Sequence, residues 1–253
     1  MYILHRDALG KLCDLPYNIK MERKLNFSVD EYYHIYNRGV EKRDIFLSDE
    51  DRDRFIRLLY LSNSVKPFVF RDVQNLPLSQ IHRGNLRVAI GAYCLMPNHF
   101  HLLIRETVEG GISAFMEKLS TGYSMYFNKK YKRIGSLFQG RFQAQHADND
   151  NYLKYLFSYI HLNPVKFIDP DWKENGITDL QKTKEYLSKY AYSSYNDFFN
   201  KTRPEQTILN KEAFPEYFET EYDFEECLED WLTYNEEFIQ ETTEKIPKPS
   251  LGI

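Results

Sequence analysis

Two histidines separated by one residue are the clearest candidates for chemistry in this chain. His99 and His101 follow the turn-forming pair Pro97-Asn98 inside a hydrophobic run. Side chains alternate between the two faces of a strand, so we expect both imidazoles on one face and Phe100 on the other. Two imidazoles held rigidly side by side could bind a divalent metal or a phosphate. The alternative interpretation is an ordinary pair of polar residues on a solvated strand face.

A second candidate lies in the segment from Asp150 to Pro164, which has the pattern of a helix. Asp148 or Asp150 could cap its start, and Pro164 should push Asn163 out of helical geometry and end it. The apolar positions recur at helical spacing as a core stripe: Leu153, Leu156, Phe157 and Ile160. A second stripe beside it, at steps of three, four and four, consists of Tyr152, Tyr155, Tyr159 and Asn163. For Tyr152 and Tyr155 we favour a role in filling the edge of a core.

Several motifs, in order, resemble the single-tyrosine transposases that carry a His-hydrophobic-His motif, and among them the REP-associated tyrosine transposase-like branch. The matching segments lie between about residues 30 and 170 and are Tyr36-Asn37-Arg38-Gly39, Tyr93 to Leu103, Tyr126-Phe127-Asn128, Gly140-Arg141-Phe142 and Tyr159 to Val165. The resemblance implies that His99, His101 and Asn163 hold a divalent cation. It also implies that Tyr159 is the nucleophile.

This set of residues suits attack on a phosphodiester. A tyrosine phenol has a pKa of about 10, so it attacks poorly unless a cation stabilises the negative charge that develops on the phosphate. Two imidazoles and one amide oxygen leave positions open for phosphate oxygens, which favours Mg²⁺ or Mn²⁺ over a closed zinc site. The activity that the resemblance implies is that of a DNA transposase, which cleaves and rejoins single-stranded, hairpin-containing DNA through a 5′-phosphotyrosine.

The distribution of charge is compatible with a DNA partner. The net charge of the chain is −4, but residues 201–253 hold 5 Lys and Arg against 14 Asp and Glu, a balance of −9 that leaves +5 for residues 1–200. Between residues 118 and 166 there are 8 basic residues and 2 acidic ones, which is typical of a phosphate-binding surface. A solvated lysine-rich face is the alternative. The candidate DNA contacts are Arg38, Arg43, Lys129, Lys130, Lys132, Arg133 and Arg141.

The order of the expected elements predicts an α+β fold with a ferredoxin-like antiparallel sheet, helices packed on one face and the histidines on a central strand. The family resemblance implies the same arrangement. The sequence indicates a strand at 31–39, a helix capped by Ser48 and running to about Ser62, a loop at 63–86, a helix capped by Ser113, and a strand at 137–145. We divide the chain into an N-terminal extension (1–29), a catalytic domain (30–170) and an acidic, partly helical C-terminal extension (171–253).

Composition sets further expectations. The three cysteines, Cys13, Cys94 and Cys227, are scattered without metal-binding spacing, which fits a reducing cytoplasm. No apolar run approaches about eighteen residues, so we expect no membrane span. Monomer and homodimer remain open. Two other functions also remain open: a module that binds hairpin DNA or RNA without cleaving it, and a metal-dependent phosphoesterase that uses water as the nucleophile.

Overall fold

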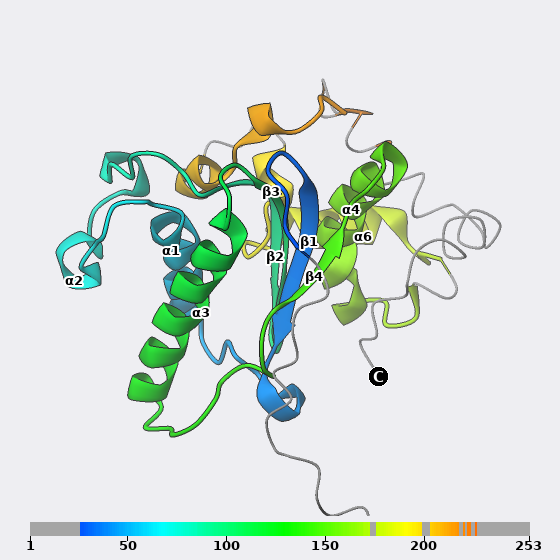
Figure 1. Cartoon of the computed structure of the whole chain (residues 1–253). Helices are drawn as coiled ribbons and strands as arrows, with labels where there is room; N and C mark the ends of the chain where they lie inside the picture. Colours follow the sequence, from blue (N-terminus) through cyan, green and yellow to red (C-terminus); the bar gives the residue numbers. More distant parts are fainter. Residues whose placement is uncertain are drawn as a thin grey trace, which may run out of the picture.

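A computed structural model describes residues 26–172, 176–198, 203–217, 220, 222, 223 and 226. Its centre is a four-stranded antiparallel sheet with the strand order β2-β3-β1-β4 (Figure 1). The strands are β1 (Tyr32–Arg38), β2 (Val88–Met96), β3 (His99–Glu106) and β4 (Gln143–His146). The two long helices between the strands give the order β-α-β-β-α-β, so the predicted ferredoxin-like α+β fold is confirmed. Most of the predicted N-terminal extension, up to residue 25, lies outside the described residues.

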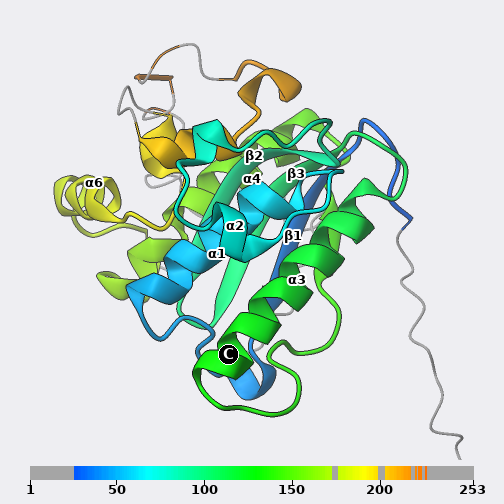
Figure 2. The same cartoon turned by 90° about the vertical axis from the view of Figure 1, so that its left-hand side faces the viewer.

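Helices cover both faces of the sheet. The helices α1 (Asp49–Ser62) and α3 (Gly111–Lys130) lie side by side on one face, as Figure 2 shows, and bury the larger core against it. The expectation of helices on one face holds for these two. The helix α4 (Asp150–Leu162) lies on the opposite face, where it packs on β2 and β3. Both faces are therefore buried, as the wholly buried strand β2 requires.

Two predicted element boundaries differ from the structure because of local backbone chemistry. The helix α3 begins at Gly111, so Ser113 lies inside it and does not cap it. The strand β4 covers only 143–145 of the predicted 137–145 and extends one residue beyond it, to His146. Gly140 adopts a φ of 74°, a left-handed conformation that interrupts an extended chain.

Helix α4 also differs at both ends. Its start is capped by Asn149, whose side-chain oxygen accepts from the backbone N–H of Tyr152, and not by either predicted aspartate. At its end, Asn163 keeps helical dihedrals (φ −52°, ψ −39°) and the chain continues as a 3-10 helix, Asn163–Phe167. Pro164 occupies the first turn of that helix, where the missing N–H leaves no bond unmade.

The segment after the predicted domain boundary packs against the sheet. Residues 192–194 run along the free edge of β2, where the N–H of Leu95 donates to the carbonyl of Tyr192 and the N–H of Ser194 donates to that of Tyr93, both at 2.9 Å. The helix α6 (Leu180–Lys189) completes a third small core with Leu162 and Trp172. The predicted 63–86 loop also contains a short helix, α2 (Phe70–Val73). No helix within the described ranges has the length and apolar character needed to cross a membrane.

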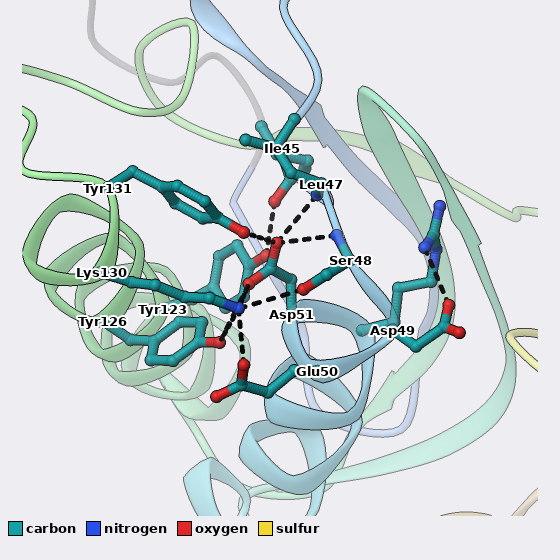
Figure 3. A network of polar contacts seen from close by, with 11 residues as sticks. Ile45, Leu47, Ser48, Asp49, Glu50, Asp51, Tyr123, Tyr126, Lys130 and Tyr131 are labelled. Carbon is teal, nitrogen blue, oxygen red and sulfur yellow. Dashed lines mark hydrogen bonds and ion pairs between the residues drawn. The ribbon is translucent and has the colours of Figure 1, made fainter.

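A buried carboxylate joins the start of α1 to the end of α3 (Figure 3). The side chain of Asp51 is fully buried and receives Lys130 Nζ at 2.7 Å and the Tyr131 hydroxyl at 2.8 Å. The backbone N–H groups of Leu47 and Ser48 also donate to it, and the bond from Ser48 is part of a capping box at the predicted cap residue. Burial tends to raise the pKa of Asp51, but the bonds from Lys130 and Tyr131 outweigh it and lower that pKa.

We expect Asp51→Asn to reduce the free energy of unfolding by about 2 kcal/mol, because it weakens the charged hydrogen bonds that Lys130 and Tyr131 make to a fully buried side chain. The folded-state pKa is lowered, so the carboxylate stabilises the fold above its ordinary value of 3.8 and loses this effect as pH falls through the folded pKa. Urea unfolding of wild type and variant, from pH 7 downward, should show a constant difference that narrows only in strong acid. Asp44→Asn, at an exposed position, serves as the control. Equal losses of unfolding free energy in both variants would contradict a stabilising role for the Asp51 carboxylate.

Candidate active site

Strand β3 carries both histidines on the face covered by α4. Phe100, Leu102 and Ile104 point to the opposite face and belong to the core beneath α1 and α3. The ring centroids of His99 and His101 are 4.9 Å apart; His101 is fully buried and His99 is partly exposed. The predicted placement of the two imidazoles on one face of a central strand is confirmed.

Tyr159 on α4 lies against His101 and against His34 of β1. Its ring centroid is 5.6 Å from that of His101 and 5.7 Å from that of His34, in edge-on contacts. The side chain is only 7% exposed. Burial raises the pKa of Tyr159 to about 12, and the nearby Tyr36 acts in the same direction. The phenol is therefore neutral at neutral pH, and it needs help to attack a phosphate.

The other tyrosines of this helix face form a stack that ends at Tyr159. Tyr152 and Tyr155 have ring centroids 5.8 Å apart, and Tyr155 and Tyr159 have centroids 5.6 Å apart, each pair nearly parallel. Tyr152 is buried, and Tyr155 is partly buried against the same apolar cluster. This agrees with the prediction that both fill the edge of a core.

Asn163 lies one turn beyond Tyr159 and is buried. Its Nδ2 donates to the carbonyl of Tyr159 at 2.7 Å, so Oδ1 is the side-chain atom that could serve as a ligand. In the part of the chain that the structure describes, no group of three or more His, Cys, Asp and Glu side chains could hold a metal ion. Two imidazoles and an amide oxygen form a set of a different composition, and the assignment of His99, His101 and Asn163 as ligands stays a prediction.

Two site residues were not predicted from the sequence. His34 on β1 is buried, with its Nε2 at 2.9 Å from Nδ1 of His101. Asn98 has its Oδ1 at 2.6 Å from Nδ1 of His99. The alternation of Tyr32, His34 and Tyr36 indicates that these three side chains share one face of a strand, which could have pointed to His34. The pairing of β1 with β3 brings His34 to His101, and this long-range contact cannot be predicted from a local sequence pattern.

Two of the connections that meet at one end of the sheet carry predicted basic residues, namely Arg43, Lys132, Arg133 and Arg141. The N–H of Gly39 donates to the carbonyl of Asn98, and the N–H of Val40 donates to that of Leu137, so the β1–α1 turn, the β2–β3 turn and the α3–β4 connection meet. This is the end at which His99 begins β3. The exposed members of the set are Lys129, Lys132 and Arg141.

Other members of the set have protein partners. Arg43 pairs with Glu41 at 2.8 Å, and Arg38 donates from Nε to the side chain of Gln139. Arg133 contacts Asn128. Lys130 is the strongest departure from expectation, because its ammonium group is held by the Asp51 network (Figure 3). These ion pairs with Asp51 and Glu50 give Lys130 a structural role, and they do not test its assignment as a DNA contact.

Comparison with known families identifies the region that holds these residues. Residues 77–163 match the family model described as "Transposase IS200 like", and this range includes both histidines, Tyr159 and Asn163. This segment is similar to IS200-like transposases. The resemblance predicted from the motifs is therefore confirmed for it.

Comparisons with curated proteins and solved structures add little to this. The search of curated proteins gives no match. Among solved structures, a REP-associated tyrosine transposase bound to a REP hairpin is 15% identical, with 69% of this chain and 82% of that chain covered and a TM-score of 0.43. A tRNA(His) guanylyltransferase from Saccharomyces cerevisiae is 12% identical, with coverage of 76% and 82% and a TM-score of 0.31. At these scores we draw nothing about function from either structure.

We expect Tyr159 to resist nitration in the folded protein without DNA, because its phenol is buried and neutral. Tetranitromethane treatment followed by peptide mass spectrometry should show modification of Tyr222, which is 68% exposed, well before that of Tyr159. Denaturation in urea should remove the difference. Equal rates at the two positions in the folded protein would mean that α4 does not hold Tyr159 against His101.

Proposed function

We propose that this transposase cleaves and rejoins single-stranded DNA with Tyr159 as the nucleophile. The observation that carries the proposal is the contact of the Tyr159 ring with His101, beside His99, on a buried face of the sheet. The match of this same segment to IS200-like transposases supports it.

In the proposed step, the phenol oxygen of Tyr159 attacks a phosphorus atom of the DNA backbone. A bond forms between that oxygen and phosphorus, and the bond from phosphorus to the 3′ oxygen of the preceding nucleotide breaks. The phenol gives up its proton, and the departing 3′ oxygen becomes a hydroxyl. The product is a 5′-phosphotyrosine, which a 3′-hydroxyl can attack to restore the DNA without ATP.

The residues present fit a hard divalent cation such as Mg²⁺ or Mn²⁺. His99 and His101 would hold it through imidazole nitrogens and Asn163 through its amide oxygen, a set that leaves positions for phosphate oxygens. When bound, the cation withdraws charge from the scissile phosphate and favours the deprotonated phenol. The chain itself holds the Tyr159 ring edge-on to two imidazoles and keeps bulk water away from the phenol.

The DNA surface that we propose is the basic end of the sheet next to His99. Lys129, Lys132 and Arg141 are exposed. Arg133 follows Lys132 directly in the sequence, and Arg38 bonds to Gln139, two residues before Arg141. Arg38, Arg43 and Arg133 can exchange their protein partners for phosphates. Folded single strands with unpaired flanking bases are the expected substrate. Lys130 is not part of this surface.

The substitution Tyr159→Phe should abolish a covalent adduct with hairpin DNA while leaving the fold and hairpin binding nearly unchanged, because only one oxygen is removed. The measurement is incubation with single-stranded hairpin DNA and Mn²⁺, followed by a denaturing gel. His99→Ala and His101→Ala should also stop adduct formation, through loss of the cation.

The matched control is Tyr155→Phe, one turn earlier in the same tyrosine stack. It should keep substantial activity. An inactive Tyr155→Phe beside an active Tyr159→Phe would assign the nucleophile to Tyr155. Cleavage by both variants would favour water as the nucleophile, and hairpin binding without any cleavage by wild type would favour a binding module.

Binding to hairpin DNA should weaken as salt rises, with a slope that reports the number of phosphate contacts. Each of Lys132→Ala and Arg141→Ala should lower the affinity and reduce the slope of log K against log salt by roughly 1. Fluorescence anisotropy over a salt series measures both quantities. The exposed Lys182→Ala, on α6, is the control and should leave the slope unchanged. An equal effect of all three substitutions would contradict this surface.

A further inference from the structure

The contacts of Asn98 fix the position of the proton on His99. Nδ2 of Asn98 donates to the carbonyl of Lys42 at 3.1 Å, which sets the orientation of the amide. Oδ1 therefore faces Nδ1 of His99, at 2.6 Å. An amide oxygen can only accept, so Nδ1 of His99 carries the hydrogen and Nε2 carries the lone pair.

Nδ1 of His101 is also hydrogen-bonded, but its partner is a second imidazole, His34, which can either donate or accept. Its Nδ1 lies 2.9 Å from Nε2 of His34, and both residues are buried. One of the two nitrogens carries the hydrogen of this bond. If Nδ1 of His101 donates, Nε2 of His101 presents a lone pair; if His34 donates, Nε2 of His101 is protonated and cannot bind a cation.

We infer that Asn98 and His34 are positioning residues that hold both site histidines in the Nδ1–H tautomer, so that both Nε2 atoms present lone pairs on the same face. The inference deepens the proposed function and rests on its requirement for two imidazole ligands. The hydrogen bond that a ligating histidine donates from its other nitrogen commonly fixes both tautomer and ring orientation.

The geometry favours this direction in two ways. The orientation of Asn98 forces the Nδ1–H form on His99, and His101 presents the same nitrogen to the protein from the same strand face. The strand pairing of β1 with β3 holds His34 beside His101, with the two rings nearly parallel at a centroid distance of 5.1 Å. His34 thus lies behind His101 as an acceptor, on the side away from Nε2.

The first test is ¹⁵N NMR of the imidazoles in the metal-free protein, with assignments from single histidine variants. We expect both His99 and His101 to show a protonated Nδ1 and an unprotonated Nε2. His34→Leu should change the tautomer distribution of His101, because the variant keeps an apolar volume but removes the acceptor. His34→Gln should retain it, because a glutamine oxygen can accept the same bond. A protonated Nε2 on His101 in wild type would overturn the inference.

The second test is the affinity for Mn²⁺ without DNA, measured by calorimetry. His34→Leu should weaken binding about 10- to 100-fold, and His34→Gln should restore most of it. Asn98→Ala should weaken binding in the same range. His146→Gln is the control, because His146, on β4, bonds to Glu31 and to neither site histidine. Wild-type affinity in His34→Leu, with the fold intact by circular dichroism, would also overturn the inference.

These results separate the inference from the proposed function. An unprotonated Nε2 on both histidines without any covalent DNA adduct would leave the inference standing and remove the proposed reaction. A covalent DNA adduct in a protein whose His101 carries its proton on Nε2 would support the proposed reaction and overturn the inference.

Discussion

The alternation of side chains along β3 is the constraint on which the rest of the structure depends. This central strand is buried on both faces, so a slip of one residue would place the imidazoles in the apolar core and Phe100 against α4. The cost of such a slip fixes the register of β3 against β1 and β2. That register in turn places His34 beside His101 and the Pro97-Asn98 turn beside the β1–α1 turn.

The position of α4 follows from the composition of the second sheet face. β2 presents small residues there, including Ala89, Ala92 and Cys94, which allow a helix rich in aromatic side chains to pack closely. The far end of α4 is fixed by His161, whose Nε2 lies 2.7 Å from the hydroxyl oxygen of Ser194. Burial lowers the pKa of His161 to about 3, so it stays neutral and holds this contact across the physiological range. Tyr159 is thus positioned by a helix anchored to both the sheet and the C-terminal segment.

Buried partners decide which charged residues belong to the fold and which are available to a ligand. Lys130 is bound to Asp51 between α1 and α3, while its neighbour Lys129 is exposed. Arg203 is similarly bound to the fully buried Asp197 and also donates to the hydroxyl of Tyr93. The Asp51–Lys130 pair links α1 to α3, and Arg203 links the C-terminal segment to Tyr93 of β2. The exposed Lys129, Lys132 and Arg141 can meet phosphates without breaking such a pair.

The sequence by itself determined the elements whose pattern is local. The period of two around His99 and His101, the helical spacing that leads to Tyr159 and the Ser48 cap are all short-range signals, and the structure agrees with each. Helix ends were less predictable, as at Asn149 and Ser113, because several nearby polar residues can compete for the same cap.

Only the tertiary structure decided which distant groups meet. The ion pair of Lys130 with Asp51, the docking of α4 on the second face, and the contacts of His34 with His101 and Tyr159 depend on strand order and on packing between segments far apart in the chain. A residue type states which bonds a side chain can form, but the partner is chosen by the fold. For this reason the paired histidines and the tyrosine could be proposed from the sequence, while the residues that orient them could not.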